Sequence, residues 1–276
     1  MKIAAVQFAA EAFNPSANRR RVRSFIAEAA SRGAGLAVVP ELAISGYALD
    51  GKQLAEVAEP FDGPTLHQWT AAARENQILI AGGFCEISEG KLYNSAMLVG
   101  PQGSLLHYRK LHLFDRERTI FTEGDLGLPV ADTPLGTIGL CVCYDLRFVE
   151  VSRLLALQGA SLIAVPTAWV GGFDRTPLDQ EGYITQARGA VVQANLNQVF
   201  IACASQAGEG FLGNSLIVDP FGKVLAGPLD GNSEEILTAE YSDSVAKAAQ
   251  YRSALVNPRK DRRTDVYGVI LKKRVL

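Results

Sequence analysis

Short apolar runs alternate with amphipathic segments along the first half of the chain. Residues 1–8 predict a strand, and the following Asn14-Pro15 supplies a helix N-cap and a proline suited to a first helical turn. Apolar residues then recur at helical spacing over residues 22–30, and glycines at 33 and 35 provide a stop. Residues 36–40 are continuously apolar, which is typical of a strand buried on both faces. The pattern therefore favours an α/β fold.

Hairpins interrupt this alternation further along the chain. Gly100-Pro101-Gln102-Gly103 separates two alternating segments and is a hairpin signal. We expect further strands at residues 78–84, 93–99, 104–108, 136–142, 161–166, 199–204, 214–218, 223–225 and 235–239. We expect further helices at residues 65–77, 150–158, about 179–195 and 242–255. No linker rich in Ser, Gly or Pro divides the chain, so we predict one domain with mixed sheets over residues 1–276, with residues 256–276 as a C-terminal tail.

Composition narrows the class of protein. Hydrophobic residues make up 48% and charged residues 20% of the chain, as in soluble globular proteins with a large core. The formal net charge of -2 gives no reason to expect nucleic acid or an anionic membrane as a partner. The basic stretch at 259–263 is interpreted as a solvated or subunit-contacting extension. No apolar signal region follows Lys2 and no apolar run reaches eighteen residues, so we expect a cytoplasmic protein.

Four cysteines, at positions 85, 141, 143 and 203, all lie in apolar, strand-like stretches. This placement fits reduced thiols in the cytosol better than a disulfide framework. No CxxC or His-rich spacing suggests zinc, so no metal is expected.

Three segments at predicted strand ends each present one reactive group. Glu41 follows one buried strand, Lys110 follows the second strand of the hairpin, and Cys143 follows a third. Because sites in open α/β sheets gather beyond the carboxyl ends of strands, these groups could converge. Each alone is a weak signal, since such acids and lysines are usually solvated and most buried cysteines are core residues.

With their neighbours, these segments resemble the nitrilase superfamily of carbon–nitrogen hydrolases. The matching segments are Val39-Pro40-Glu41-Leu42 with Gly46-Tyr47, Arg109-Lys110-Leu111-His112-Leu113-Phe114, and Cys143-Tyr144-Asp145-Leu146-Arg147-Phe148. They occur in the family's order, and the resemblance runs from residue 1 to about residue 240.

The resemblance implies a four-layer α-β-β-α sandwich with two mixed β-sheets, which pairs with a second copy into a homodimer or a higher homo-oligomer. It implies that Glu41 is the general base, Lys110 the electrophilic support and Cys143 the nucleophile that forms a thioester. Glu117 matches a second family glutamate that positions the substrate and helps proton transfer. His112 is interpreted as a structural hydrogen-bond partner. No metal or organic cofactor is needed for this chemistry.

Tyr144-Asp145 after the cysteine resembles the amidase and carbamoylase branches, which implies a small carboxamide or N-carbamoyl substrate. A true nitrilase is the first alternative, and a non-catalytic binding or scaffold member is the second. We expect the pocket to be lined by Tyr47, Tyr144, Trp169 and Phe173.

Two further assignments depend on the fold. Arg175 and Arg188 are candidate free cations for a substrate carboxylate. If the third strand stays extended, Cys141 and Cys143 point the same way, so the choice of Cys143 depends on the Tyr144-Asp145 context.

Overall fold

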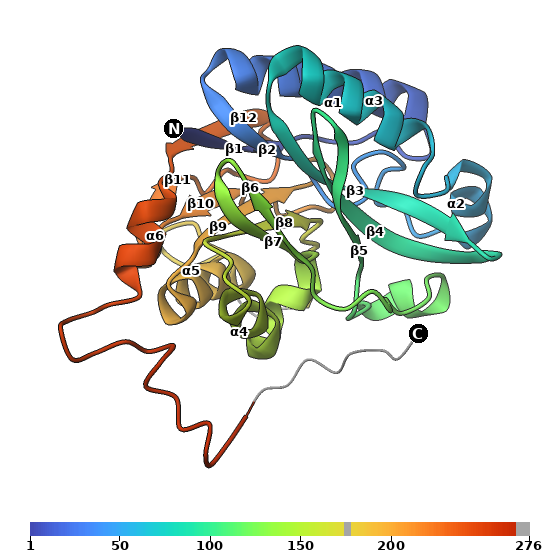
Figure 1. Ribbon diagram of the computed structural model, residues 1–276. Coiled ribbons are helices and arrows are strands. Elements are labelled where there is room, and N and C mark those ends of the chain that lie inside the picture. The colour runs from blue at the N-terminus through green and yellow to red at the C-terminus, as the bar shows by residue number, and fades with distance from the viewer. Residues whose placement is uncertain (174–177, 269–276) are drawn as a thin grey trace.

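The computed structural model describes residues 1–173 and 178–268, and the strands of this part of the chain form two six-stranded sheets (Figure 1). The first sheet has the order β12 (Glu235–Glu240), β1 (Lys2–Gln7), β2 (Ala34–Val38), β3 (Leu79–Ser88), β4 (Lys91–Gly100) and β5 (Gly103–Arg109). The second has the order β11 (Val224–Ala226), β10 (Leu216–Val218), β9 (Phe200–Ser205), β8 (Leu162–Thr167), β7 (Gly136–Leu140) and β6 (Val130–Thr133).

The two sheets have the same plan. In each, three central strands are parallel, namely β1, β2 and β3 in the first sheet and β7, β8 and β9 in the second. The strands toward the edges are antiparallel and are joined mostly by hairpins. Helices α1 (Pro15–Ser31) and α3 (Pro64–Asn76) connect the parallel strands of the first sheet, and α4 (Val149–Leu157) and α5 (Thr185–Asn197) connect those of the second. The mixed sheets predicted from the sequence are confirmed.

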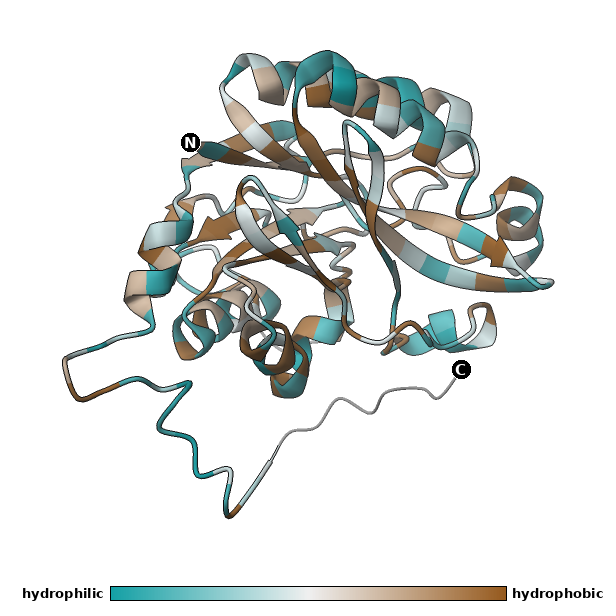
Figure 2. Cartoon of the chain, viewed as in Figure 1, coloured by the Kyte–Doolittle hydropathy of each residue, from teal (hydrophilic) through white to brown (hydrophobic). Residues whose placement is uncertain are grey.

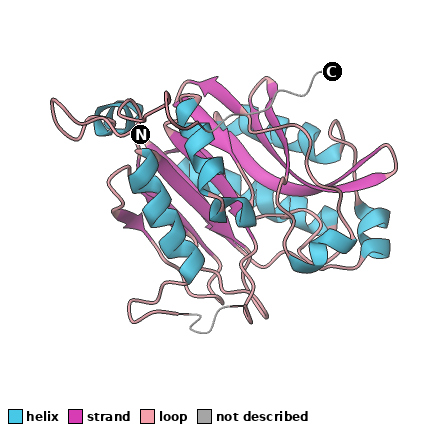
Figure 3. Cartoon of the chain, turned by 90° about the horizontal axis from the view of Figure 1, so that it is seen from below, coloured by secondary structure: helices cyan, strands magenta, loops and turns pink. Residues whose placement is uncertain are grey.

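Apolar contacts arrange these elements in four layers. The inner faces of the two sheets share one core, in which Leu36 and Val38 of β2 and Ile138 and Ala164 of the second sheet are completely buried. A second core lies between the outer face of the first sheet and helices α1 and α3. Figure 2 shows apolar strands inside and hydrophilic residues along the outer helices, and Figure 3 shows helices at the periphery of the strands. The molecule is the expected α-β-β-α sandwich.

Two predicted helices have different bounds in the structure. Helix α5 begins at Thr185 rather than at about residue 179, because Asp179 Oδ1 accepts hydrogen bonds from the backbone N–H groups of Glu181 and Tyr183 and forms a local turn instead. Helix α6 (Asp243–Ala249) ends six residues before the predicted end at 255. Its later residues bury little apolar surface, and Leu255 is 91% exposed. The short helix α2 (Gly51–Val57) and strand β6 were not predicted from the sequence.

The tail is described only as far as residue 268, and residues 269–276 lie outside the described part. Arg259 fixes the tail to the ends of two helices, since its guanidinium donates to the carbonyl oxygens of Ala156, Asn197 and Gln198. In the described residues no helix has both the length and the apolar character that crossing a membrane requires.

Candidate active site

Glu41 lies three residues beyond the end of β2 and is completely buried. Its backbone N–H donates to the carbonyl oxygen of Thr167 at 3.3 Å, and the side chain of Gln206 donates to its carbonyl oxygen at 2.8 Å. Gly83 of β3 allows this turn to approach closely, because a Cβ atom there would lie 2.4 Å from the backbone nitrogen of Leu42. The second sheet and a glycine of the first therefore fix the backbone that carries the carboxylate.

Lys110 lies one residue beyond β5 and reaches two buried carboxylates. Its Nζ donates to Glu41 Oε1 at 2.6 Å and to Glu117 Oε1 at 2.8 Å. Burial alone would lower the pKa of Lys110, but Glu41 and Glu117 outweigh it and hold the pKa above the ordinary value. Lys110 is therefore an ammonium group fixed between two acids.

Glu117 lies in a 3₁₀ turn, η1 (Asp115–Thr119), and is completely buried. Its Oε1 also accepts a hydrogen bond from Tyr47 Oη at 2.6 Å, and its Oε2 accepts from the backbone N–H of Phe114 at 3.0 Å. The charged run Arg116-Glu117-Arg118 is therefore not simply a surface ion-pair loop, because Glu117 points into the site. Glu117 and Glu41 therefore both contact the ammonium group of Lys110.

Burial opposes the charge of Glu41. Desolvation raises the pKa of Glu41 to about 7, against the opposing effects of Lys110 and of Asn94, which donates its Nδ2 to Oε1 at 2.6 Å. The other oxygen, Oε2, is buried and has no hydrogen-bond partner among the described residues. A carboxylate with a pKa near neutrality and an unused oxygen is suited to taking up a proton.

Cys143 begins a second 3₁₀ turn, η2 (Cys143–Arg147), beyond β7. Its φ of 45° is in the left-handed region, which is uncommon for residues other than glycine and is found at functional turns. Burial and the charge of Glu41 raise the pKa of the thiol well above its usual value, while Lys110 and a backbone hydrogen bond from Ala168 oppose the rise. The resting thiol is therefore protonated, and its reaction as a nucleophile needs a base.

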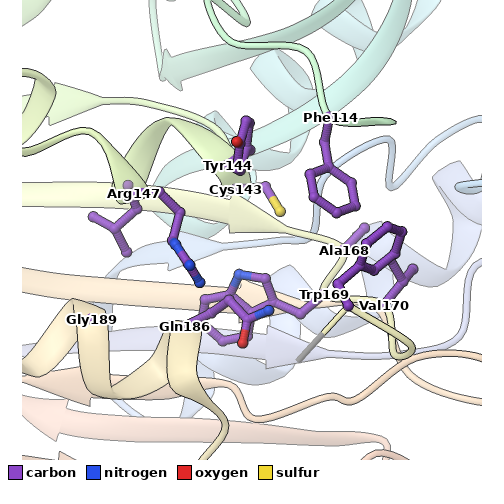
Figure 4. A pocket seen from close by; sticks show the side chains of 11 residues that line it. Phe114, Cys143, Tyr144, Arg147, Ala168, Trp169, Val170, Gln186 and Gly189 are labelled. Atoms are coloured by element: carbon purple, nitrogen blue, oxygen red, sulfur yellow. The ribbon is translucent and has the colours of Figure 1, made fainter. Parts of the chain in front are cut away.

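The structure separates the two neighbouring cysteines. Strand β7 ends at Leu140, so the chain is no longer extended at Cys143. Cys141 is completely buried in the core between the layers, whereas Cys143 lines a cavity (Figure 4).

This cavity has a volume of about 190 Å³. Its lining residues are Phe114, Cys143, Tyr144, Leu146, Arg147, Ala168, Trp169, Val170, Phe173, Gln186 and Gly189. Three of the four expected pocket residues, Tyr144, Trp169 and Phe173, are among them, and the fourth, Tyr47, instead donates to Glu117. The wall is mainly aromatic and apolar, as in sites for small organic molecules.

The cation at this wall is not the one expected. Arg188 is bound by Asp179 at 2.7 Å and Glu181 at 2.6 Å on the surface, so the expectation that it is free was wrong. Arg175 lies outside the described residues. Arg147 lines the cavity instead (Figure 4). Its place in the same turn as Cys143 was the available sequence signal.

Asn94 was also missed by the sequence interpretation. It is a polar residue in the buried part of strand β4, and it is 1% exposed. Such a buried amide requires hydrogen-bond partners, which was the signal that pointed to it.

Comparisons with known proteins agree on a family. Residues 2–251 match a family model described as "Carbon-nitrogen hydrolase". The chain is 36% identical over 275 residues to "Omega-amidase NIT2" of Homo sapiens, with 94% of each chain covered. It is 33% identical over 273 residues to a protein named "Nitrilase" from Pyrococcus abyssi, which covers 97% of this chain and 99% of that protein.

A solved structure shows the same fold. A double mutant of the amidase from Nesterenkonia sp. AN1, in complex with acrylamide, has a TM-score of 0.80 and 25% sequence identity. The match covers 96% of this chain and 95% of that chain.

Proposed function

This chain belongs to the carbon–nitrogen hydrolase family, and from that premise we propose that it hydrolyses a small carboxamide or N-carbamoyl compound through a thioester on Cys143. The observation that carries the proposal is a buried ion-pair network, in which Lys110 contacts both Glu41 and Glu117, beside the cavity that Cys143 lines. These groups supply a base, a cation and a nucleophile, as amide hydrolysis requires.

In the first step, Glu41 takes the proton of the Cys143 thiol, and the sulfur attacks the substrate carbonyl carbon. The carbonyl π electrons move to oxygen, which becomes an oxyanion. The ammonium of Lys110 and a backbone N–H near Tyr144 stabilise it, a contribution of about 3–4 kcal/mol per donor in comparable sites.

In the second step, the oxyanion reforms the carbonyl and the C–N bond breaks. Glu41 returns its proton to the nitrogen, which leaves as ammonia or an amine, and the acyl group stays on sulfur as a thioester. Glu41 then takes a proton from water while the water oxygen attacks the thioester. Collapse of this second intermediate breaks the C–S bond and releases the carboxylic acid, and Glu41 returns its proton to the departing sulfur, which restores the Cys143 thiol. Glu117 holds Lys110 in place throughout, which is the role its contact supports.

The substrate is expected to be small and partly apolar. Arg147 is exposed at the aromatic wall, and no carboxylate in residues 1–173 or 178–268 forms an ion pair with it. An amide that carries a carboxylate is therefore a substrate class to test beside neutral amides of equal length.

The activity is tested by an ammonia-release screen over aliphatic amides, ω-amides, amino-acid amides and N-carbamoyl amino acids. We expect Cys143→Ala to abolish the release. Cys141→Ala is the matched control, a buried thiol two residues away, and it is expected to retain activity. A nitrile that yields acid and ammonia while the matching amides stay intact would support the nitrilase alternative instead. If Cys143→Ala leaves hydrolysis unchanged, the catalytic proposal fails.

We further propose a homodimer, formed through the face of α4 and α5. Large apolar side chains are exposed there, including Val192 at 53% and Leu196 at 48% on α5. Apolar side chains on one helix face favour burial against another copy. The tail packs beside this face through Arg259 and is expected to contribute to the contact.

The remaining proposals concern the whole chain. We propose that residues 1–276 form one domain, supported by the shared core between the sheets. We propose a cytoplasmic location, supported by the four unpaired cysteines.

A further inference from the structure

Asp145 lies two residues after Cys143 and is completely buried. Its Oδ1 accepts hydrogen bonds from the backbone N–H of His112 at 3.0 Å and from His112 Nδ1 at 2.8 Å. Its Oδ2 accepts from Tyr108 Oη at 2.6 Å and from the backbone N–H of Val142 at 3.0 Å. Four donors therefore converge on one carboxylate.

These donors come from the two segments that carry the reactive groups. Tyr108 and His112 each lie two residues from Lys110, one on either side, and Val142 immediately precedes Cys143. The first segment continues from β5 of one sheet, and the second continues from β7 of the other. Asp145 thus joins the two sheets at the place where the ammonium and the thiol must meet.

Further contacts make the lysine segment rigid. Tyr108 Oη also accepts a hydrogen bond from the backbone N–H of Leu111 at 3.3 Å, and the backbone N–H of Lys110 donates to the carbonyl oxygen of Asn94 at 2.8 Å. Burial and the charge of Asp145 raise the pKa of Tyr108 well above its usual value, so the phenol keeps its proton and donates it. The turn over residues 108–112 is therefore tied to its own strand and to the opposite sheet.

The His112 ring is held from a second side. It stacks on Phe148 with a centroid separation of 3.6 Å and an interplanar angle of 12°. This stacking keeps Nδ1 directed at Asp145. The sequence interpretation of His112 as a hydrogen-bonding residue agrees with this contact.

We propose that Asp145 is a positioning residue, which fixes the separation between the Lys110 ammonium and the Cys143 turn. The inference depends on the proposed amide hydrolysis, in which Lys110 stabilises the oxyanion formed by attack of Cys143. A carboxylate suits this role because both of its oxygens only accept hydrogen bonds, whereas an amide of the same shape has one acceptor and one donor. A displacement of about 1 Å at a reacting centre costs about 10²-fold in rate. The hydrogen bonds of Asp145 are therefore expected to affect kcat rather than substrate affinity.

The competing explanation is that Asp145 only stabilises the fold. Tyr241 allows the two explanations to be separated, because it is also a buried tyrosine that joins the sheets. It follows β12 of the first sheet, and its hydroxyl donates to the carbonyl oxygen of Leu135 at 2.7 Å and lies 2.9 Å from Ser161 Oγ. Leu135 and Ser161 precede β7 and β8, so this contact lies at the ends of those strands opposite Cys143.

The experiment compares Tyr108→Phe and Asp145→Asn with Tyr241→Phe, using an amide substrate from the screen. We expect Tyr108→Phe to lower kcat by about 10- to 100-fold with KM changed by less than about two-fold. Asp145→Asn, which disturbs more of the four contacts, is expected to lose at least as much. Tyr241→Phe is expected to keep kcat within about two-fold while losing similar stability in urea.

Equal kcat values for Tyr108→Phe and Tyr241→Phe at equal stability would overturn the inference, as would a rise in KM at unchanged kcat. If Asp145→Asn does not fold, Tyr108→Phe decides the question alone, since it removes one hydroxyl and keeps the ring. Failure of the proposed function looks different. In that case the wild-type chain itself releases no ammonia from any amide, which overturns both proposals.

Discussion

Glu41 combines complete burial with one oxygen that no described residue satisfies. Its other oxygen accepts from Lys110 and Asn94, so the charged form is supported from one side only. Burial first, and the charge of Glu117 after it, raise the pKa of Glu41 to about 7 against the lowering effects of Lys110 and Asn94. In the proposed reaction, the unused oxygen is where the thiol proton goes.

Removing the Asn94 donor is therefore expected to shift the pH dependence of the reaction. Asn94→Ala takes away a hydrogen bond to the ionised carboxylate, so the pKa of Glu41 rises further. Because Glu41 must be ionised to act as a base, activity is present above its pKa and is lost as the pH falls through it. The acid limb of the kcat/KM profile should move to higher pH, and a pH–rate series measures this.

Asn197→Ala is the control for that series. Asn197 is also a buried asparagine, but its amide contacts Gln193 within α5. We expect its acid limb to match that of the wild type. An unmoved acid limb in Asn94→Ala would show that the Asn94 hydrogen bond does not control the titrating base.

The sequence predicts single residues better than it predicts their partners. Glu41, Lys110 and Cys143 each follow a strand within a recognisable motif, and the structure brings Glu41 and Lys110 into contact beside the cavity of Cys143. The contact between Asn94 and Glu41 depends on the pairing register of β3 with β4 and on the position of the turn after β2. No local sequence pattern encodes either of these. The pairing of Arg188 with Asp179 depended in the same way on where α5 begins.

At the level of elements, the strands were predicted more completely than the helix ends. Buried parallel strands are continuous apolar runs, and such runs are visible in the sequence. Helix α5 begins late because an aspartate turn competes with the helix, and β6 is an edge strand whose residues are mostly half-buried. These features depend on side-chain hydrogen bonds and on neighbours in the sheet, so hydrophobic periodicity does not report them.

The close approach of β3 to the turn of Glu41 gives a prediction at this level. Gly83→Ala would place a Cβ atom 2.4 Å from Leu42 N and 2.8 Å from the Cα of Glu41, and backbone atoms must move to relieve it. We expect a loss of about 1–3 kcal/mol in unfolding free energy and reduced kcat. Urea unfolding and ammonia-release kinetics measure the two effects.

Gly51→Ala is the matched glycine substitution for this experiment. Its added Cβ atom would meet only side-chain atoms of Ile120 at 3.7 Å, an ordinary contact. Unfolding free energy should change by less than about 0.5 kcal/mol. If both alanine variants were equally stable and active, the steric account of Gly83 would be wrong.

On the scale of the whole molecule, the outer layer formed by α4 and α5 exposes apolar side chains, among them those of Val192 and Leu196 on α5. We expect the wild-type chain to sediment at about twice its mass of 29.6 kDa, and Val192→Asp with Leu196→Asp to shift it to the monomer mass. Burying an aspartate without a partner costs several kcal/mol, enough to dissociate most dimers. Analytical ultracentrifugation provides the measurement.

Leu105→Asp controls for the added charge. Leu105 is 40% exposed on β5, in the first sheet, and is not part of the α4–α5 face. This variant should sediment as the wild type does. A monomeric wild type would exclude the proposed dimer, and a double-aspartate variant that stays dimeric would place the contact on another face.

The reactive side chains and much of the cavity wall come from different parts of the sequence. The side chains proposed to carry the reaction all lie at or before residue 143, whereas Ala168, Trp169, Val170, Phe173, Gln186 and Gly189 form much of the wall. The reactive side chains and much of the cavity wall are therefore encoded in successive stretches of the gene. Exchange of the single stretch that encodes residues 168–189 would change which molecule fits and leave the acid, the amine and the thiol unaltered. With this arrangement, substitutions in one stretch of the gene can change the substrate during evolution while the reaction is retained.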